Sequence, residues 1–279
     1  MRFVVVPQWQ GSGSSRAMRL SDGALAIMGD LPSAKTTLVD VPLGAGEALG
    51  TGVARFSSLR QVHDRIRMAL AGDPEPAVLI GGDCGVELAG VEHALATGDG
   101  RLAVVWLDAH PDLGALGSAP RAFCGTVARA ILGEGADGLS GEPALSPDRF
   151  VAAGVRLIDD DEQDYLDAHD VRLLRVPELG DGALAEQVAA TGATSVYVHV
   201  DLDVLDPGQL EGIGDPQPFG LELPALVAEL KALVARFPLA GAGIAMFSPE
   251  SPEAAPGDLP TVLRILSALT SPAQPRAVA

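Results

Sequence analysis

The stretch LAVVWLDAHPD, residues 102–112, joins six apolar residues directly to a cluster of acidic and imidazole side chains. An apolar run without polar alternation is typical of a strand buried on both faces of a parallel sheet. The same arrangement recurs in SVYVHVDLD, residues 195–203, and in AVLIGGDC, residues 77–84. Three buried strands that each end in polar side chains indicate an α/β fold with a site at the carboxyl edge of its sheet.

Strand-like runs alternate with helical segments along the chain. Apolar spacing typical of a helix is clearest at residues 56–70 and 223–234. This order predicts a mostly parallel sheet with helices on both faces. With 279 residues and no obvious linker, we expect a single domain spanning residues 1–279. The eight predicted strands are residues 3–6, 37–41, 77–80, 102–107, 150–153, 171–176, 195–200 and 239–245.

The composition argues against several classes of partner. Lys and Arg number 19 against 37 Asp and Glu, a formal charge of −18 that opposes binding to nucleic acid or anionic membranes. No apolar stretch is long enough for a signal peptide or a membrane span, so we expect a cytoplasmic protein. Two cysteines are too few for a disulfide framework.

The acidic residues after the strands have the spacing of a metal site. Alternate residues of an extended strand end point the same way, so Asp108, His110 and Asp112 can converge. Asp201 and Asp203 repeat the arrangement. Buried carboxylates are costly unless a cation neutralises them, and carboxylates with one imidazole suit Mn²⁺ or a similar ion. The alternative for either motif alone is a capped turn or a surface histidine.

Taken together, the motifs resemble a known family. GGDC (residues 81–84), DAHPD (108–112) and HVDLDVLDP (199–207), in this order, resemble the ureohydrolase family of arginases, agmatinases and formimidoylglutamases. The resemblance implies a three-layer α/β/α fold, two Mn²⁺ ions and an assembly of three or six chains. It further implies that water activated by the ions attacks the carbon of a linear amidine or guanidino substrate.

The resemblance also implies a ligand set. The first ion would be held by Cys84, Asp108, Asp112 and Asp201. The second would be held by Asp108, His110, Asp201 and Asp203. Asp112 would in addition relay a proton to the leaving amine.

The chain departs from the family pattern at three positions. Cys84 stands where the family usually has a histidine ligand; either its thiolate binds metal, shifting the preference toward Zn²⁺, Fe²⁺ or Ni²⁺, or it is a small buried residue and the ion is lost. Cys124 stands where a histidine shuttles protons; it either takes that role or is a core residue. Met246 falls where the family has a glutamate that pairs with the guanidinium group. Glu250 or Glu253 in the following loop could replace that glutamate, and the alternative is that both are solvated loop residues.

Two functions follow from these observations. The first is a metal-dependent hydrolase that cleaves a carbon–nitrogen bond of a linear amidine or guanidino compound. The second is a non-catalytic or regulatory relative in which one metal ion, at the side of His110 and Asp203, holds the loops together. The remaining histidines, His63, His93 and His169, are predicted to be exposed rather than ligands.

Overall fold

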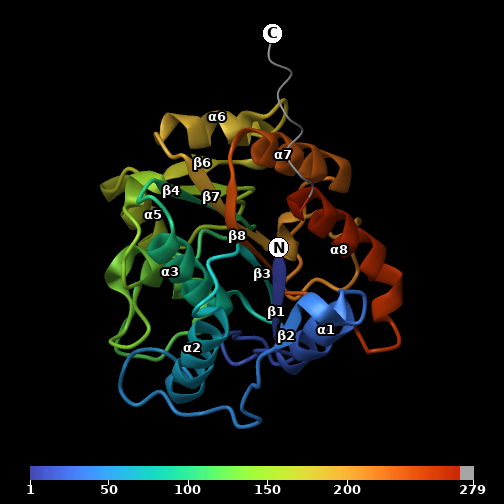
Figure 1. Ribbon diagram of the computed structural model, residues 1–279. Coiled ribbons are helices and arrows are strands. Elements are labelled where there is room, and N and C mark those ends of the chain that lie inside the picture. Colours follow the sequence, from blue (N-terminus) through green and yellow to red (C-terminus); the bar gives the residue numbers. More distant parts are fainter. Residues whose placement is uncertain (271–279) are drawn as a thin grey trace.

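The computed structural model describes residues 1–270, whose strands form one eight-stranded sheet in the order β2-β1-β3-β8-β7-β4-β5-β6 (Figure 1). All eight predicted strands are present, and every neighbouring pair is parallel. The strands are β1 (Arg2–Val6), β2 (Thr36–Leu38), β3 (Ala77–Gly81), β4 (Leu102–Leu107), β5 (Phe150–Ala153), β6 (Arg172–Leu174), β7 (Ser195–Asp201) and β8 (Leu239–Ala245).

Helices cover both faces of the sheet, which confirms the predicted three-layer architecture (Figure 1). On one face, neighbouring helices pack in the order α1 (Met18–Met28), α8 (Ala255–Thr270), α7 (Leu223–Arg236) and α6 (Ala183–Ala190). The other face carries α2 (Phe56–Leu70), α3 (Glu87–Thr97), α4 (Val127–Arg129) and α5 (Asp160–Ala168). Short helical turns are η1 (Ser33–Lys35), η2 (Cys84–Val86), η3 (Cys124–Thr126), η4 (Ala130–Glu134), η5 (Pro147–Arg149), η6 (Val176–Glu178) and η7 (Leu202–Val204). Within residues 1–270, no helix is both long and apolar enough to cross a membrane.

The register of the central strands places the acidic motifs beside one another. β4 and β7 are neighbours, and Leu107 pairs with Val200, so Asp108 and Asp201 occupy adjacent strand ends. β8 flanks β7 on its other side, where Asp201 pairs with Ala245. Because parallel strands share their direction, the residues that follow β3, β4, β7 and β8 all emerge at one edge.

His63 lies in surroundings that the sequence predicted wrongly. Instead of being exposed, it is buried in α2, and its Nε2 lies 2.9 Å from a carboxylate oxygen of Glu92 in α3. His63 faces α3, whereas its polar neighbours Arg60 and Asp64 are exposed, and the spacing within α2 alone gives no sign of this contact. His169 is exposed as expected, whereas His93 is partly buried.

The approach of α3 to β8 depends on a glycine. A Cβ atom at position 243 would collide with the carboxylate of Glu87, the first and fully buried residue of α3. Gly257 in α8 offers a contrast, because a Cβ atom there would meet no atom within 4 Å. A side chain therefore fits without a collision at position 257 but not at position 243.

We expect Gly243→Ala to lower the free energy of unfolding by about 1–3 kcal/mol, because the added methyl group overpacks the α3–β8 contact. Gly257→Ala is the control, and it should be neutral or stabilising by up to about 1 kcal/mol because alanine favours a helix. Urea unfolding followed by circular dichroism measures both. Equal stability of the two variants would contradict the collision.

Candidate metal centre

A cavity of about 420 Å³ opens at the carboxyl edge of the sheet, beside the residues that follow β3, β4, β7 and β8. Other parts of its wall come from the loop around Ser12 and from the loop that carries Asp215. Every residue that the sequence analysis proposed for metal binding or proton transfer lines this cavity. These residues are Cys84, Asp108, His110, Asp112, Cys124, Asp201 and Asp203.

Asp83 fixes the turn that carries Cys84. Its two carboxylate oxygens accept hydrogen bonds from the side chain of Gln8 and from the backbone N–H groups of Gly11 and Gly85, at 2.8, 2.8 and 2.9 Å. Burial raises the pKa of Asp83 to about 6, although these hydrogen bonds lower it. The carboxylate thus ties the first loop of the chain to the end of β3, and Cys84 follows at the cavity wall.

Hydrogen bonds also connect the ends of β4 and β7. An oxygen of Asp203 accepts from the backbone N–H of Ala109 at 2.9 Å, and an oxygen of Asp201 accepts from the backbone N–H of Asp203 at 2.8 Å. Asp108 accepts from the backbone N–H of His110 at 2.7 Å. A backbone N–H group therefore orients each of these carboxylates independently of any bound ion.

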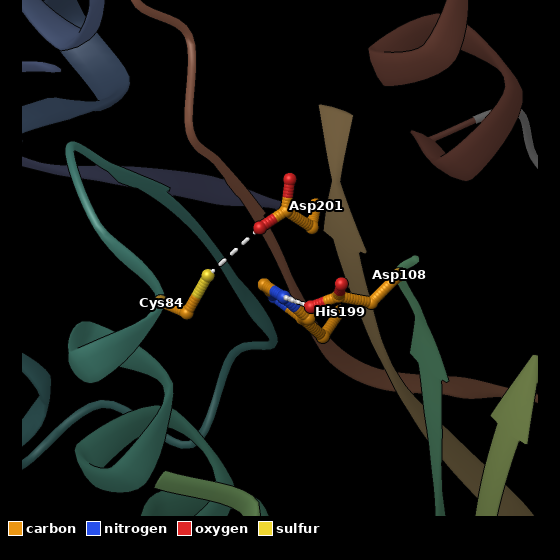
Figure 2. A group of neighbouring side chains, drawn as sticks. All are labelled: Cys84, Asp108, His199 and Asp201. Carbon is orange, nitrogen blue, oxygen red and sulfur yellow. Dashed lines mark hydrogen bonds and ion pairs between the residues drawn. The ribbon is translucent and has the colours of Figure 1, made fainter. Parts of the chain in front are cut away.

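The donor atoms fall into two groups that share Asp108. In the first group, the donor atoms of Asp108, His110 and Asp203 lie within 4.8 Å of one another. In the second, the same limit holds for Cys84, Asp108, His199 and Asp201, whose side chains point toward a common space (Figure 2). His199 belongs to the quoted HVDLDVLDP motif, but the sequence analysis gave it no role. The signal was its position two residues before Asp201, on the same face of the strand.

The electrostatics of the carboxylates favour a cation. Burial, together with the charges of Asp203 and Asp108, raises the pKa of Asp201 well above its usual range. Burial and the charge of Asp108 raise the pKa of Asp203 to about 7. Burial alone would lower the pKa of His110, but hydrogen bonds to Asp108 and Asp203 raise it to about 12. In the absence of metal, the His110 imidazolium thus pairs directly with Asp108 and Asp203, and a divalent ion bound there would displace its proton.

Asp112 stands apart from both donor groups. It lines the cavity and is buried, but its backbone is left-handed, with a φ angle of 55°. That conformation interrupts the strand-like alternation from which its convergence with Asp108 and His110 was expected. One carboxylate oxygen of Asp112 has no hydrogen-bond partner. Burial and the charge of Asp108 raise the pKa of Asp112 well above the usual range.

The two cysteines face each other across the wall of the cavity. A hydrogen bond with the Cys124 thiol and burial raise the pKa of Cys84 well above its usual range. The Cys84 thiol also donates to Asp201 at 3.1 Å. Cys84 is both buried and a member of a donor group, whereas Cys124 is partly buried at the start of η3 and belongs to neither group.

The replacements considered for the missing glutamate do not reach the cavity. Met246 lines it, but Glu250 and Glu253 are exposed and are not among its lining residues. An acidic residue comes instead from Asp215, which lies 3.9 Å from the Nε2 atom of His110 and is 62% exposed. Sequence reasoning missed Asp215, because an aspartate in a loop rich in glycine and proline carries no distinguishing pattern.

Comparison with known proteins agrees with this arrangement. The sequence model of the Arginase family matches residues 10–256. The chain is similar to the proclavaminate amidinohydrolase of Streptomyces clavuligerus, with 35% identity over 162 residues, which span 56% of this chain and about half, 49%, of that protein. It is 32% identical to the formimidoylglutamase of Halobacterium salinarum over 221 residues, covering 77% of this chain and 69% of that protein.

Solved structures extend the comparison to nearly the whole fold. The arginase of Entamoeba histolytica, whose structure contains L-ornithine, superposes with a TM-score of 0.82 over 96% of each chain at 21% sequence identity. An identity of 21% supports a shared fold alone. The family match covers most of the sequence, and this chain therefore belongs to the Arginase family.

Proposed function

We propose that this protein is a metal-dependent hydrolase that cleaves a carbon–nitrogen bond of a linear amidine or guanidino compound. The observation that carries the proposal is the sharing of Asp108 by two donor groups at one cavity, because a shared carboxylate is how a protein holds two ions close together. The family relationship supports it, since the relatives named above are arginase, formimidoylglutamase and proclavaminate amidinohydrolase.

The residues fit divalent cations. No Lys or Arg is among the described residues that line the cavity. The Arg156 guanidinium lies behind the wall, where it donates to the backbone carbonyl of Asp203, and His110 is the group within the cavity that pairs directly with the carboxylates. Two divalent ions, Mn²⁺ or the softer ions favoured by a thiol, would neutralise the carboxylates, activate water and polarise the substrate. We propose Cys84, Asp108, His110, Asp201 and Asp203 as ligands from the two donor groups, and Asp112, which lies outside both groups, as a further candidate that the family resemblance implies.

The chain's own groups supply the remaining chemistry. Asp112 is a buried carboxyl with an unpartnered oxygen at the cavity, which would let it relay a proton to the leaving amine. The thiol of Cys124 lies at the same wall and is the alternative proton carrier. Asp215 at the rim of the cavity would pair with a cationic amidinium group of the substrate. The family resemblance gives this pairing role to a glutamate.

The second candidate, a non-catalytic relative with one ion, is favoured by Cys84, Cys124 and Met246, which stand in the cavity where the family pattern has ionisable partners. It predicts metal at His110 and Asp203 without turnover. A single domain over residues 1–279, a cytoplasmic location and an assembly of three or six chains stay predictions.

Removing two carboxylates tests the proposal. We expect the double variant Asp108→Ala, Asp203→Ala to lose activity by at least on the order of 10³-fold and to lose bound metal, because both donor groups are broken. The assay is release of urea, ammonia or a related amide from a panel of guanidino and amidine compounds after loading with Mn²⁺, Fe²⁺, Ni²⁺ or Zn²⁺. Asp64→Asn, at an exposed position on α2, is the control and should leave activity unchanged. Full activity in the double variant would refute the proposal.

Stability of the metal-free protein should fall as pH rises from 5 to 8. The pKa of Asp203 is raised to about 7 in the folded chain, so its contribution is fully present below about pH 4 and is lost as pH rises through about 7. Asp201 and His110 act in the same direction, since their folded pKa values are also raised. Each proton retained only by the folded chain adds a slope of about 1.4 kcal/mol per pH unit.

Urea unfolding in the presence of a chelator measures this dependence. Divalent metal should flatten it, and Asp203→Asn should reduce the slope in the metal-free protein because one titrating group is removed. A metal-free protein that became more stable over the same interval would show that the buried carboxylates are not held as inferred.

Asp215→Asn should raise KM for a cationic amidine about two- to fivefold with little change in kcat, because a rim charge that is 62% exposed makes a weak ion pair. Glu250→Gln provides the comparison, since that glutamate is exposed outside the cavity. The measurement is KM from steady-state kinetics at low and high salt. KM should rise in Asp215→Asn at low salt and stay unchanged in Glu250→Gln. An unchanged KM in the Asp215 variant would remove it from substrate binding.

A further inference from the structure

His199 is a fully buried histidine with no hydrogen bond to either ring nitrogen. It lies on β7, two residues before Asp201 and on the same face of the strand. Its Nε2 is 3.9 Å from Asp108, and its Nδ1 is 3.3 Å from Glu87. An unsatisfied buried donor or acceptor costs about 1–3 kcal/mol, so two unpartnered nitrogens on one ring call for a further partner.

Glu87 extends the arrangement away from the cavity. This carboxylate is fully buried at the start of α3, and one of its oxygens accepts a hydrogen bond from the hydroxyl of Tyr197 at 2.5 Å. The other oxygen has no hydrogen-bond partner, and it is the one that lies beside His199. A carboxylate behind the outer nitrogen of a histidine is the usual support of a metal-binding imidazole.

Trp106 holds the ring of His199 in place. The centres of the two rings are 3.8 Å apart, and the indole N–H of Trp106 donates to Asp108 at 3.2 Å. One side chain thus positions both the imidazole and the neighbouring carboxylate.

The four donors suit one metal ion. Those of Cys84, Asp108, His199 and Asp201 lie within 4.8 Å of one another, with one sulfur, one nitrogen and two carboxylates (Figure 2). Zinc takes such ligands tetrahedrally, at about 2.0–2.3 Å, which brings ligand atoms to roughly 3.3–3.8 Å from one another. Small side-chain rotations would close the difference. Thiolate with imidazole favours Zn²⁺ over Mn²⁺.

We infer that His199 is the imidazole ligand of the first metal site, oriented by Glu87, and that Cys84, Asp108, His199 and Asp201 form a site selective for Zn²⁺. The inference deepens the proposed function, on which it rests for the presence of metal in this cavity. It differs from the ligand set implied by the family resemblance, in which Asp112 completed this site. The imidazole ligand of the first site would then come from β7 instead of from the turn that follows β3.

Metal binding to the intact protein tests the inference without an activity assay. The protein is stripped with a chelator, titrated with Zn²⁺ and with Mn²⁺, and analysed for bound metal per chain. Wild type should bind Zn²⁺ at one site at least about 100-fold more tightly than Mn²⁺. His199→Gln should lose that site while the ion beside His110 and Asp203 remains. Glu87→Gln should weaken zinc binding about 10- to 100-fold.

A buried pair elsewhere supplies matched controls. His63 and Glu92, 2.9 Å apart between α2 and α3, form a second buried histidine–glutamate pair outside the cavity. His63→Gln and Glu92→Gln should leave zinc binding unchanged. Unaltered zinc affinity in His199→Gln, or an equal loss in the controls, would overturn the inference.

Spectroscopy keeps the test decisive if a buried variant does not fold. With one Zn²⁺ per wild-type chain, X-ray absorption should show one sulfur and one imidazole in the metal's first coordination shell, and Cys84→Ser should remove the sulfur. A first shell without imidazole would refute the role of His199. These outcomes are independent of turnover: absent amidine hydrolysis would count against the proposed function alone, and a missing imidazole against this inference alone.

Discussion

The confinement of several carboxylates within the buried ends of two adjacent parallel strands is the constraint on which the rest of the centre depends. Leu107 of β4 pairs with Val200 of β7, so the residues that follow them, Asp108 and Asp201, are neighbours. Backbone N–H groups donate to the carboxylate oxygens of both aspartates and fix their orientation. Repulsion and desolvation then raise the pKa values of Asp201 and Asp203. Positive charge stabilises such an arrangement at neutral pH, and the His110 imidazolium, the nearby Arg156 guanidinium and bound metal ions are its possible sources.

Cys84 stands where the family resemblance implies a histidine ligand, and a metal ion held by its thiol would be one that prefers softer donors. In a family built on oxygen and imidazole donors, a thiol at position 84 introduces a softer ligand beside Asp201. The nearest compensating feature is His199, a nitrogen donor that approaches from the strand rather than from the loop. The donor set therefore bears on the choice of metal beyond what family membership gives.

The sequence predicted the sheet well because each strand is a continuous apolar run, a signal that is local and needs no knowledge of neighbours. The acidic residues of the cavity that directly follow β4 and β7 could likewise be predicted. Four features could not. His63 is buried by another helix, Asp112 takes a left-handed backbone, Asp215 reaches the cavity from a loop, and His199 depends on Glu87, which is distant in the sequence. Each depends on tertiary contacts or on a backbone angle that residue spacing does not encode.

The side chains of Glu87 and Tyr197 fill the space beside two glycines, Gly243 and Gly90. A side chain at Gly243 would collide with the Glu87 carboxylate, and one at Gly90 would collide with the hydroxyl of Tyr197, its hydrogen-bond partner. Replacing either glycine therefore lowers stability only while the tyrosine and the glutamate are kept. These four positions should vary together among descendants of this chain, with the two large polar residues lost before either glycine acquires a side chain.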